Sequence, residues 1–146
     1  MAFWAISYRL TTFLYQPMKL EPDHPSTQAI QSAQTDWIQV AGERIAHSVI
    51  LGSHGERKPW QCETAQALSE AHFEQICAFK PELVIFGSGA RQQFVHPRLY
   101  QSLIAAGIGI ETMDTLAACR TYNVLASEDR HVIAALIIEP EPAMHM

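Results

Sequence analysis

An unbroken apolar run, Leu83 to Phe86, is the feature that most limits the fold, and it is followed directly by Gly87-Ser88-Gly89. A strand that does not alternate between apolar and polar residues is buried on both faces, which is typical of a parallel sheet covered by helices. The run therefore predicts an α/β protein. We expect residues 35–140 to form one soluble domain with a single core.

Helix and strand patterns alternate on both sides of this run. Upstream, the apolar spacing after Ser69 predicts a helix that continues to Lys80 and is ended by Pro81. Downstream, the order of elements is helix, strand, helix, strand. We expect these four at Pro97 to Gly107, residues 108–110, residues 115–127 with Asp114 as N-cap, and residues 132–138.

Apolar residues on both sides of Ala41-Gly42-Glu43 predict a β-hairpin at the N-terminal side of the layer. Its arms are expected at residues 37–40 and 45–51. The polar stretch from Gly52 to Pro59 is expected to be a loop.

Charge and cysteine content exclude some classes of function. The formal net charge is −5 and the 10 Lys and Arg residues are scattered, so no nucleic-acid partner is expected. The 3 cysteines include no CxxC pair, and none of the 7 histidines lies at ligand spacing from another His or Cys, so no metal or other cofactor is expected. Unpaired cysteines fit a reducing, cytoplasmic compartment.

The Gly87-Ser88-Gly89-Ala90-Arg91-Gln92 segment is the candidate binding loop, because it joins a buried strand to a helix. Gln92 stands where a dinucleotide-binding fingerprint has its third glycine, and the helix begins late, which disfavours such a cofactor site. Two interpretations stay open: a glycine turn at the strand end, or an anion site made by backbone N–H groups and Arg91. The ligand-binding set predicted around this crevice is Gly87, Ser88, Gly89, Arg91, Asp114, Thr115 and Arg120.

The helix expected over residues 115–127 is small or apolar nearly all round, so we predict that it is buried between layers. A buried Arg120 would then need an acceptor, either an internal carboxylate or a ligand or partner. Cys119 is expected to be a core residue, because the effect of a helix N-terminus on a thiol fades beyond the first turn.

Three segments carry a resemblance to a known family: the Gly-Ser-Gly loop, Met113-Asp114-Thr115, and Cys119-Arg120-Thr121-Tyr122-Asn123. Residues 19–138 resemble the domain-of-unknown-function 498 family, which includes mitochondrial respiratory complex I assembly factors and bacterial proteins. The resemblance implies a three-layer α/β fold, with a central mixed β-sheet flanked by helices and an N-terminal β-hairpin packed on it. It also implies a role in assembling a respiratory membrane complex, and no catalytic mechanism.

Two functions are therefore carried forward. The first is a non-enzymatic binding or assembly protein whose partner belongs to a respiratory membrane complex. Such a protein would be cytoplasmic and peripheral to the inner membrane. The second is a binder of a small molecule or anion, or an enzyme, that uses the crevice at the Gly87 loop. A polar pocket with a perturbed acid would favour the second, and an exposed apolar patch the first.

Residues 1–17 differ in composition from residues 18–146, which we expect to form the single α/β domain. They contain no acidic residue and a single Arg9, and their apolar stretch is too short to span a bilayer. Three interpretations stay open: an extension upstream of a start at Met18, as the resemblance implies, a tail docked on the body, or a weak membrane-surface or targeting element.

We predict that residues 1–17 are dispensable for folding, because the composition changes at Met18 and prolines follow. A chain that begins at Met18 should unfold cooperatively within a few degrees of the full chain in a thermal melt followed by circular dichroism. Loss of the cooperative transition would refute this.

Overall fold

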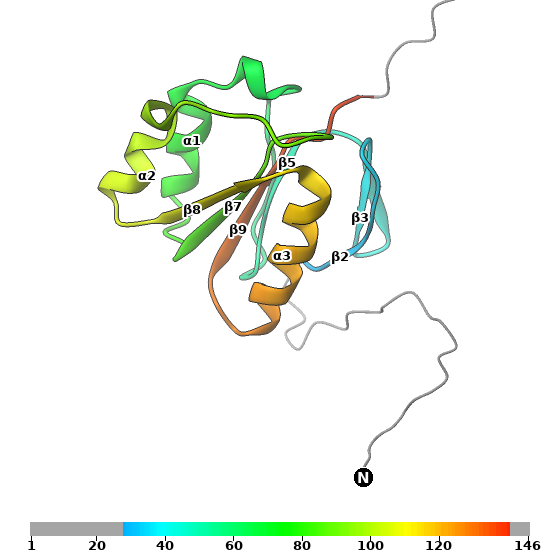
Figure 1. Cartoon of the computed structure of the whole chain (residues 1–146). Helices are drawn as coiled ribbons and strands as arrows, with labels where there is room; N and C mark the ends of the chain where they lie inside the picture. Colours follow the sequence, from blue (N-terminus) through cyan, green and yellow to red (C-terminus); the bar gives the residue numbers. More distant parts are fainter. Residues whose placement is uncertain (1–27, 141–146) are drawn as a thin grey trace, which may run out of the picture.

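A five-stranded mixed sheet lies at the centre of the structure, a computed structural model that describes residues 28–140 (Figure 1). The expectations for residues 1–17 lie outside this range. The strand order is β6-β5-β9-β7-β8. β7 is parallel to both β8 and β9, whereas β5 is antiparallel to β6 and β9. The strands are β5 (Val49–Gly52), β6 (Arg57–Pro59), β7 (Leu83–Gly87), β8 (Gly109–Met113) and β9 (Val132–Leu136).

Helices cover both faces of this sheet, so its central strands are apolar on both sides. The helices α1 (Glu70–Cys77) and α2 (Gln101–Ala105) lie on one face. The opposite face is covered by α3 (Thr115–Ser127). Along β9, Ile133 and Ala135 contribute to the core under α1 and α2, whereas Ala134 and Leu136 pack with α3. Two short 3₁₀ helices, η1 (Ala65–Ala67) and η2 (Pro97–Tyr100), complete the α1 and α2 side.

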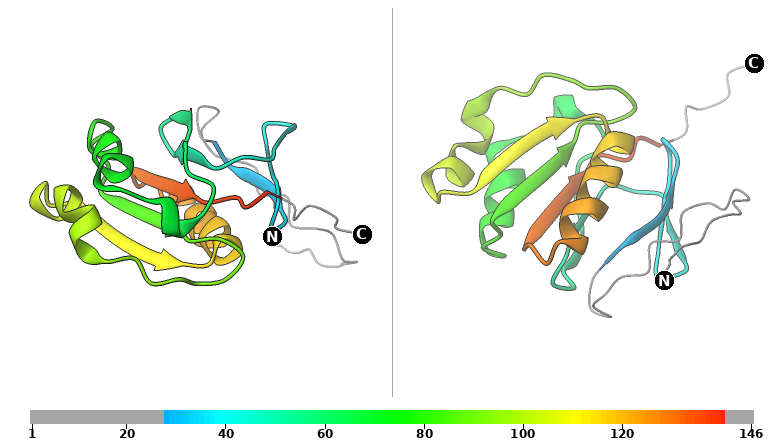
Figure 2. Two further views of the ribbon diagram at one scale, coloured as in Figure 1. Left: turned by 90° about the horizontal axis from the view of Figure 1, so that it is seen from above. Right: turned by 60° about the horizontal axis from the view of Figure 1, so that its bottom comes forward.

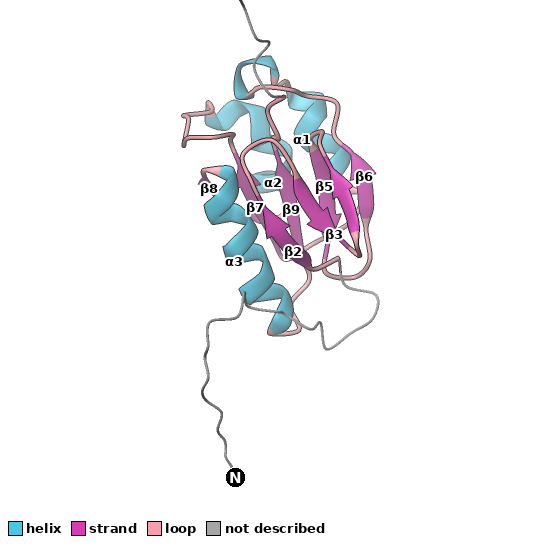
Figure 3. Ribbon diagram, turned by 90° about the vertical axis from the view of Figure 1, so that its right-hand side faces the viewer, coloured by secondary structure: helices cyan, strands magenta, loops and turns pink. Residues whose placement is uncertain are grey.

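A second, three-stranded antiparallel sheet packs beside α3 (Figure 3). It consists of β2 (Ile30–Ala33), β3 (Ile38–Val40) and β4 (Glu43–Ile45). Ala41 and Gly42, with φ of 52° and 77°, make the tight turn between β3 and β4. The side chain of Asn123 on α3 accepts from the Ile30 N–H at 2.9 Å and donates to the Ile30 carbonyl at 2.7 Å. The amide of Asn123 thus fixes the small sheet to the helix.

The fold predicted from the sequence is confirmed as α/β with a central mixed sheet, and the bounds of several elements were wrong. The second arm of the hairpin ends at Ile45, and residues 49–51 belong to the central sheet. β6 lies in the stretch that was expected to be a loop. Its residues are all exposed and show no apolar pattern, so the sequence did not indicate a strand there. The first helix ends at Cys77, before Lys80, which adopts a left-handed φ of 52°.

Two further segments differ in detail from the expectation. The helix expected from Pro97 is divided into η2 and α2, with Gly107 at a φ of 75° closing α2 as predicted. β8 continues to Met113, beyond the short strand expected at residues 108–110. None of the helices formed within residues 28–140 is long and apolar enough to cross a membrane.

Candidate functional site

The Gly87 loop and the start of α3 lie together at the carboxyl ends of β7 and β8, as the sequence predicted. The Ser88 N–H donates to the Met113 carbonyl at 2.9 Å, and the Thr115 N–H donates to the Gly89 carbonyl at 2.8 Å. The Thr115 hydroxyl accepts from the Gly89 N–H at 2.9 Å and donates to the Ile137 carbonyl at 2.7 Å. Thr115 is 1% exposed, so its hydroxyl is a buried junction between the loop, α3 and the end of β9.

Two glycines make this close approach possible. A Cβ atom on Gly87 would lie 2.9 Å from the Cα atom of Thr115, too close to backbone that cannot easily move. Gly89 has a φ of +123°, a conformation that other residues rarely adopt. The two glycines are therefore explained by backbone packing and conformation alone, without any ligand.

Three successive N–H groups of the loop already have acceptors within the protein. Ser88 and Gly89 donate to Met113 and Thr115, as above, and the Ala90 N–H donates to the Glu139 carboxylate at 3.0 Å. The loop therefore holds a carboxylate from its own chain where an anion was predicted. Asp114 acts as N-cap of α3, with its carboxylate accepting from the Ala117 N–H at 2.9 Å, as expected. Glu139 was not singled out in the sequence, because it lies 49 residues beyond Ala90.

Residues 90–96 continue from the loop along the outer edge of β8 (Figure 2). The Ser88 hydroxyl accepts from the Gln93 N–H at 2.9 Å, and the Gln93 side chain donates to the Ser88 carbonyl at 3.2 Å. Val95 is buried in the core under α1 and α2. Between these two anchored residues, Phe94 is 83% exposed, more than the other two large apolar side chains on the described surface, Ile104 and Val124. The available sequence signal was the apolar pair Phe94-Val95 within an otherwise polar stretch.

Arg120 does not join the predicted site. Both Arg91 and Arg120 are exposed, and no ion pair of Arg120 with another described residue is present. The prediction of a buried Arg120 was wrong because α3 has two different faces. It buries Thr115, Ala118, Cys119, Tyr122 and Ala126, and it exposes Arg120, Val124 and Ser127. Small residues such as alanine tolerate both environments, so the sequence pattern gave no clear outer face.

A pocket of about 650 Å³ lies near the same end of the sheet, between the chain around Trp60 and the segment after β9. Cys62 lines it and donates its thiol proton to the Thr64 carbonyl at 2.9 Å. Burial raises the pKa of Cys62, and it raises the pKa of Cys119 to about 12. Neither thiol is therefore an activated nucleophile at neutral pH, and Cys119 is the core residue that was expected.

We predict that Thr115→Val destabilises the protein and that Arg120→Ala does not. The valine leaves a buried N–H at Gly89 and a carbonyl at Ile137 without a partner, at a cost of about 1–3 kcal/mol each. Arg120→Ala removes an exposed side chain and should change the free energy of unfolding by no more than about 0.5 kcal/mol. Urea denaturation measures both, with Thr115→Ser as the matched control that keeps the hydroxyl. If Arg120→Ala were less stable than Thr115→Val, the Arg120 guanidinium would have a structural role and this prediction would be wrong.

Comparisons with known proteins agree with this architecture. The family described as "Protein of unknown function (DUF498/DUF598)" matches residues 30–137. The mouse (Mus musculus) protein named NADH dehydrogenase (ubiquinone) 1 alpha subcomplex assembly factor 3 is 30% identical over 132 residues, which are 87% of this chain and 71% of the relative.

Two solved structures show the same fold. An NMR structure from Xanthomonas campestris is 33% identical, with a TM-score of 0.72 over 92% of this chain and 98% of that one. An NMR structure from Bordetella pertussis, described as a Mth938-like domain, is 25% identical, with a TM-score of 0.74 over 88% of this chain and 100% of that one. Since the family match spans most of the chain, from β2 to the end of β9, the chain belongs to the DUF498/DUF598 family.

Proposed function

We propose that this chain is a non-enzymatic binding protein that supports the assembly of respiratory complex I. It docks a protein partner through residues 90–96, which run along the outer edge of β8. Relatives such as the mouse protein are named as complex I assembly factors, which supports a role of this class. The proposed partner is a subunit of that membrane complex, so the chain would act in the cytoplasm, at the periphery of the inner membrane.

The proposal rests on the exposure of Phe94 between two anchored neighbours. Its side chain is 83% exposed, while Gln93 on one side is hydrogen-bonded to Ser88 and Val95 on the other is buried. An aromatic side chain that is already positioned loses less conformational entropy on binding than one on a free loop. Large aromatic side chains are enriched among the residues that dominate binding energy at interfaces.

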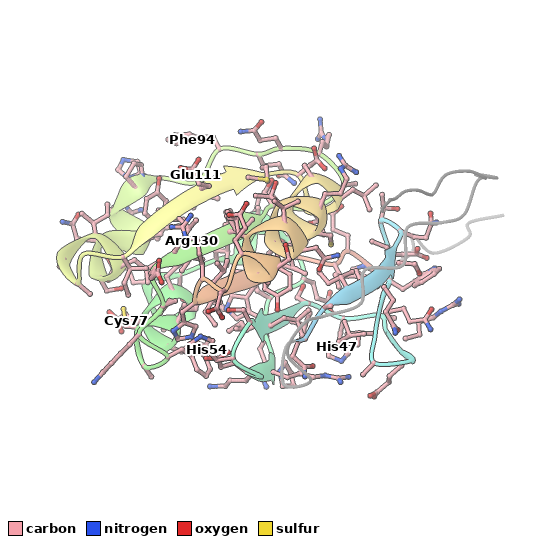
Figure 4. The ribbon with its side chains drawn as sticks, turned by 90° about the horizontal axis from the view of Figure 1, so that it is seen from below. His47, His54, Cys77, Phe94, Glu111 and Arg130 are labelled. Atoms are coloured by element: carbon pink, nitrogen blue, oxygen red, sulfur yellow. The ribbon has the colours of Figure 1, made fainter. Side chains whose placement is uncertain are left out.

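The surroundings of Phe94 extend this contact surface. β8 is the last strand of the sheet, so its outer edge is not paired with another strand of residues 28–140. Residues 90–96 run along this edge, so they are the part of it that a partner would contact. Figure 4 shows Phe94 beside Glu111 of β8 at this edge. The exposed Arg91 and Arg98 lie on either side of Phe94 in the sequence, and arginine is also enriched at protein interfaces.

The predicted site residues gain a different role in this proposal. Ser88, Gly89 and Thr115 fix the loop through the hydrogen bonds described above, and so they position Phe94 without contacting the partner. Arg91 is the member of the predicted set that would contact the partner. Arg120 lies on the outer face of α3 and plays no part in this surface.

We predict that Phe94→Ala weakens partner binding without unfolding the protein. The truncation of a residue that dominates an interface costs 2 kcal/mol or more, equivalent to a loss of about 30-fold in affinity. The tagged full chain would be purified from native membranes of complex I-containing cells that encode it, and the co-purified complex I subunits would be quantified by mass spectrometry. Their recovery should fall steeply in the variant while its melting temperature stays unchanged.

Val124→Ala is the matched control, because Val124 is a 56% exposed apolar residue on α3 that lies outside the proposed surface. It should recover the same subunits as the unaltered chain. Unchanged recovery with Phe94→Ala, or an equal loss with Val124→Ala, would refute the proposed docking surface.

A second candidate function is anion binding at the Gly87 loop, favoured by the carboxylate that the loop already holds. Glu139 would have to leave the Ala90 N–H before a phosphate or dicarboxylate could bind there. We predict that phosphate shifts the NMR amide signals of Gly89 and Ala90 in a Glu139→Ala variant and not in the unaltered chain. Shifts in the unaltered chain at millimolar phosphate would instead favour anion binding as the function.

A further inference from the structure

Three potential metal ligands meet at the end of the sheet opposite to the Gly87 loop. His54 and Glu56 lie in the turn between β5 and β6, and His131 directly precedes β9. The antiparallel pairing of Gly52 with Ile133 brings the turn and the start of β9 together. Because His131 is 75 residues from Glu56, no spacing in the sequence could reveal this group.

The three side chains already lie close together. The Nε2 atom of His131 lies 2.7 Å from a carboxylate oxygen of Glu56. The imidazole rings of His54 and His131 stack with centroids 3.9 Å apart and an interplanar angle of 4°. One nitrogen from each histidine and one oxygen from Glu56 all lie within 4.8 Å of one another. Because the nitrogen lone pairs of stacked rings lie in parallel planes, the exposed His54 ring would rotate out of the stack to place its nitrogen at the metal-binding distance of about 2.0–2.2 Å from an ion held by Glu56 and His131.

The backbone beneath this group is held by a buried serine. Ser53, 4% exposed, donates its hydroxyl to the Arg130 carbonyl at 2.6 Å and accepts from the Val132 N–H at 2.9 Å. The Ser53 N–H also donates to the Val132 carbonyl at 3.0 Å. These bonds lie on either side of His131 in the sequence, so the turn and His131 are fixed relative to each other before any ion binds.

The carboxylate of Glu56 is oriented as well. Its second oxygen accepts from the His54 N–H at 3.0 Å, which leaves the other oxygen facing His131. Gly52 leaves room for this carboxylate, because a Cβ atom at that position would overlap it. The neighbouring Arg130 is paired with Glu82 at 3.4 Å, so its positive charge is partly offset. Ligands held by their own hydrogen bonds lose less freedom when a metal binds.

We infer that His54, Glu56 and His131 bind one divalent transition-metal ion, for which Zn²⁺ is the best match. Two imidazole nitrogens and one carboxylate oxygen form a ligand set that zinc uses with a fourth position left open. Mg²⁺ and Ca²⁺ prefer oxygen ligands throughout and are disfavoured here. The ion would join the β5–β6 turn to the start of β9 and would keep one position for water or another ligand.

The alternative is that the group is only a hydrogen-bonded pair of His131 and Glu56, with His54 stacked on the His131 ring. That arrangement needs no metal and would depend little on His54. His54 is exposed and lies in a turn, so its removal should leave the fold intact. His54 is therefore the residue that separates the two explanations.

The test is isothermal titration calorimetry of the full chain with Zn²⁺ after treatment with a chelator. We expect one Zn²⁺ per chain and a raised melting temperature, because a ligand that binds the folded state stabilises it. His54→Ala and Glu56→Gln should each weaken binding at least about tenfold, since even the loss of an outer-shell partner costs about 10–100-fold. Co²⁺ in place of Zn²⁺ should give visible absorption bands that disappear in both variants.

His47→Ala is the matched control, because His47 is exposed and lies outside the group (Figure 4). It should bind Zn²⁺ like the unaltered chain. The inference would be overturned by absence of Zn²⁺ binding, or by binding that survives His54→Ala and Glu56→Gln unchanged. If His131→Ala fails to fold, the exposed His54 still decides the outcome.

Discussion

Strand β9 is the constraint on which the rest of the structure depends. It is paired along both edges, antiparallel to β5 and parallel to β7, and all five of its residues are buried. A strand that is apolar on both faces requires a covering layer on each side. Helices α1 and α2 cover one face of the sheet, and α3 covers the other. The small three-stranded sheet extends the layer of α3. The Gly87 loop lies at one end of this strand, and His131 lies at the other.

The carboxyl end of β9 explains why the Gly87 loop differs from a ligand-binding glycine loop. Such a loop can bind an anion when its N–H groups point into open space. Here Thr115 accepts from Gly89 while it donates to the carbonyl of Ile137, and Glu139 accepts from Ala90. Buried N–H groups must be paired, and this chain pairs them internally. The same hydrogen bonds position residues 90–96, so the loop supports a contact surface at its outer end.

The two proposed sites are physically separate. Phe94 lies beside β8 at one edge of the sheet, whereas His54 lies in the turn that leads to β6 at the other (Figure 4). A metal ion bound by His54, Glu56 and His131 would therefore act on partner binding only through the stability of the sheet they share. A protein could dock along β8 with the ion present or absent. Each proposal can consequently fail without affecting the other.

The sequence by itself determined the layers, because the apolar run at Leu83 to Phe86 and the second run before Glu139 can be buried only between helices. It also determined the N-cap at Asp114 and the turn at Gly42, which depend on local chemistry. Only the tertiary structure decided the contacts between distant residues: Ala90 with Glu139, Glu56 with His131, and the outward face of Arg120. The local pattern of apolar residues determines which segments form helices and strands. Which polar groups meet depends on the pairing of strands that are far apart in the chain.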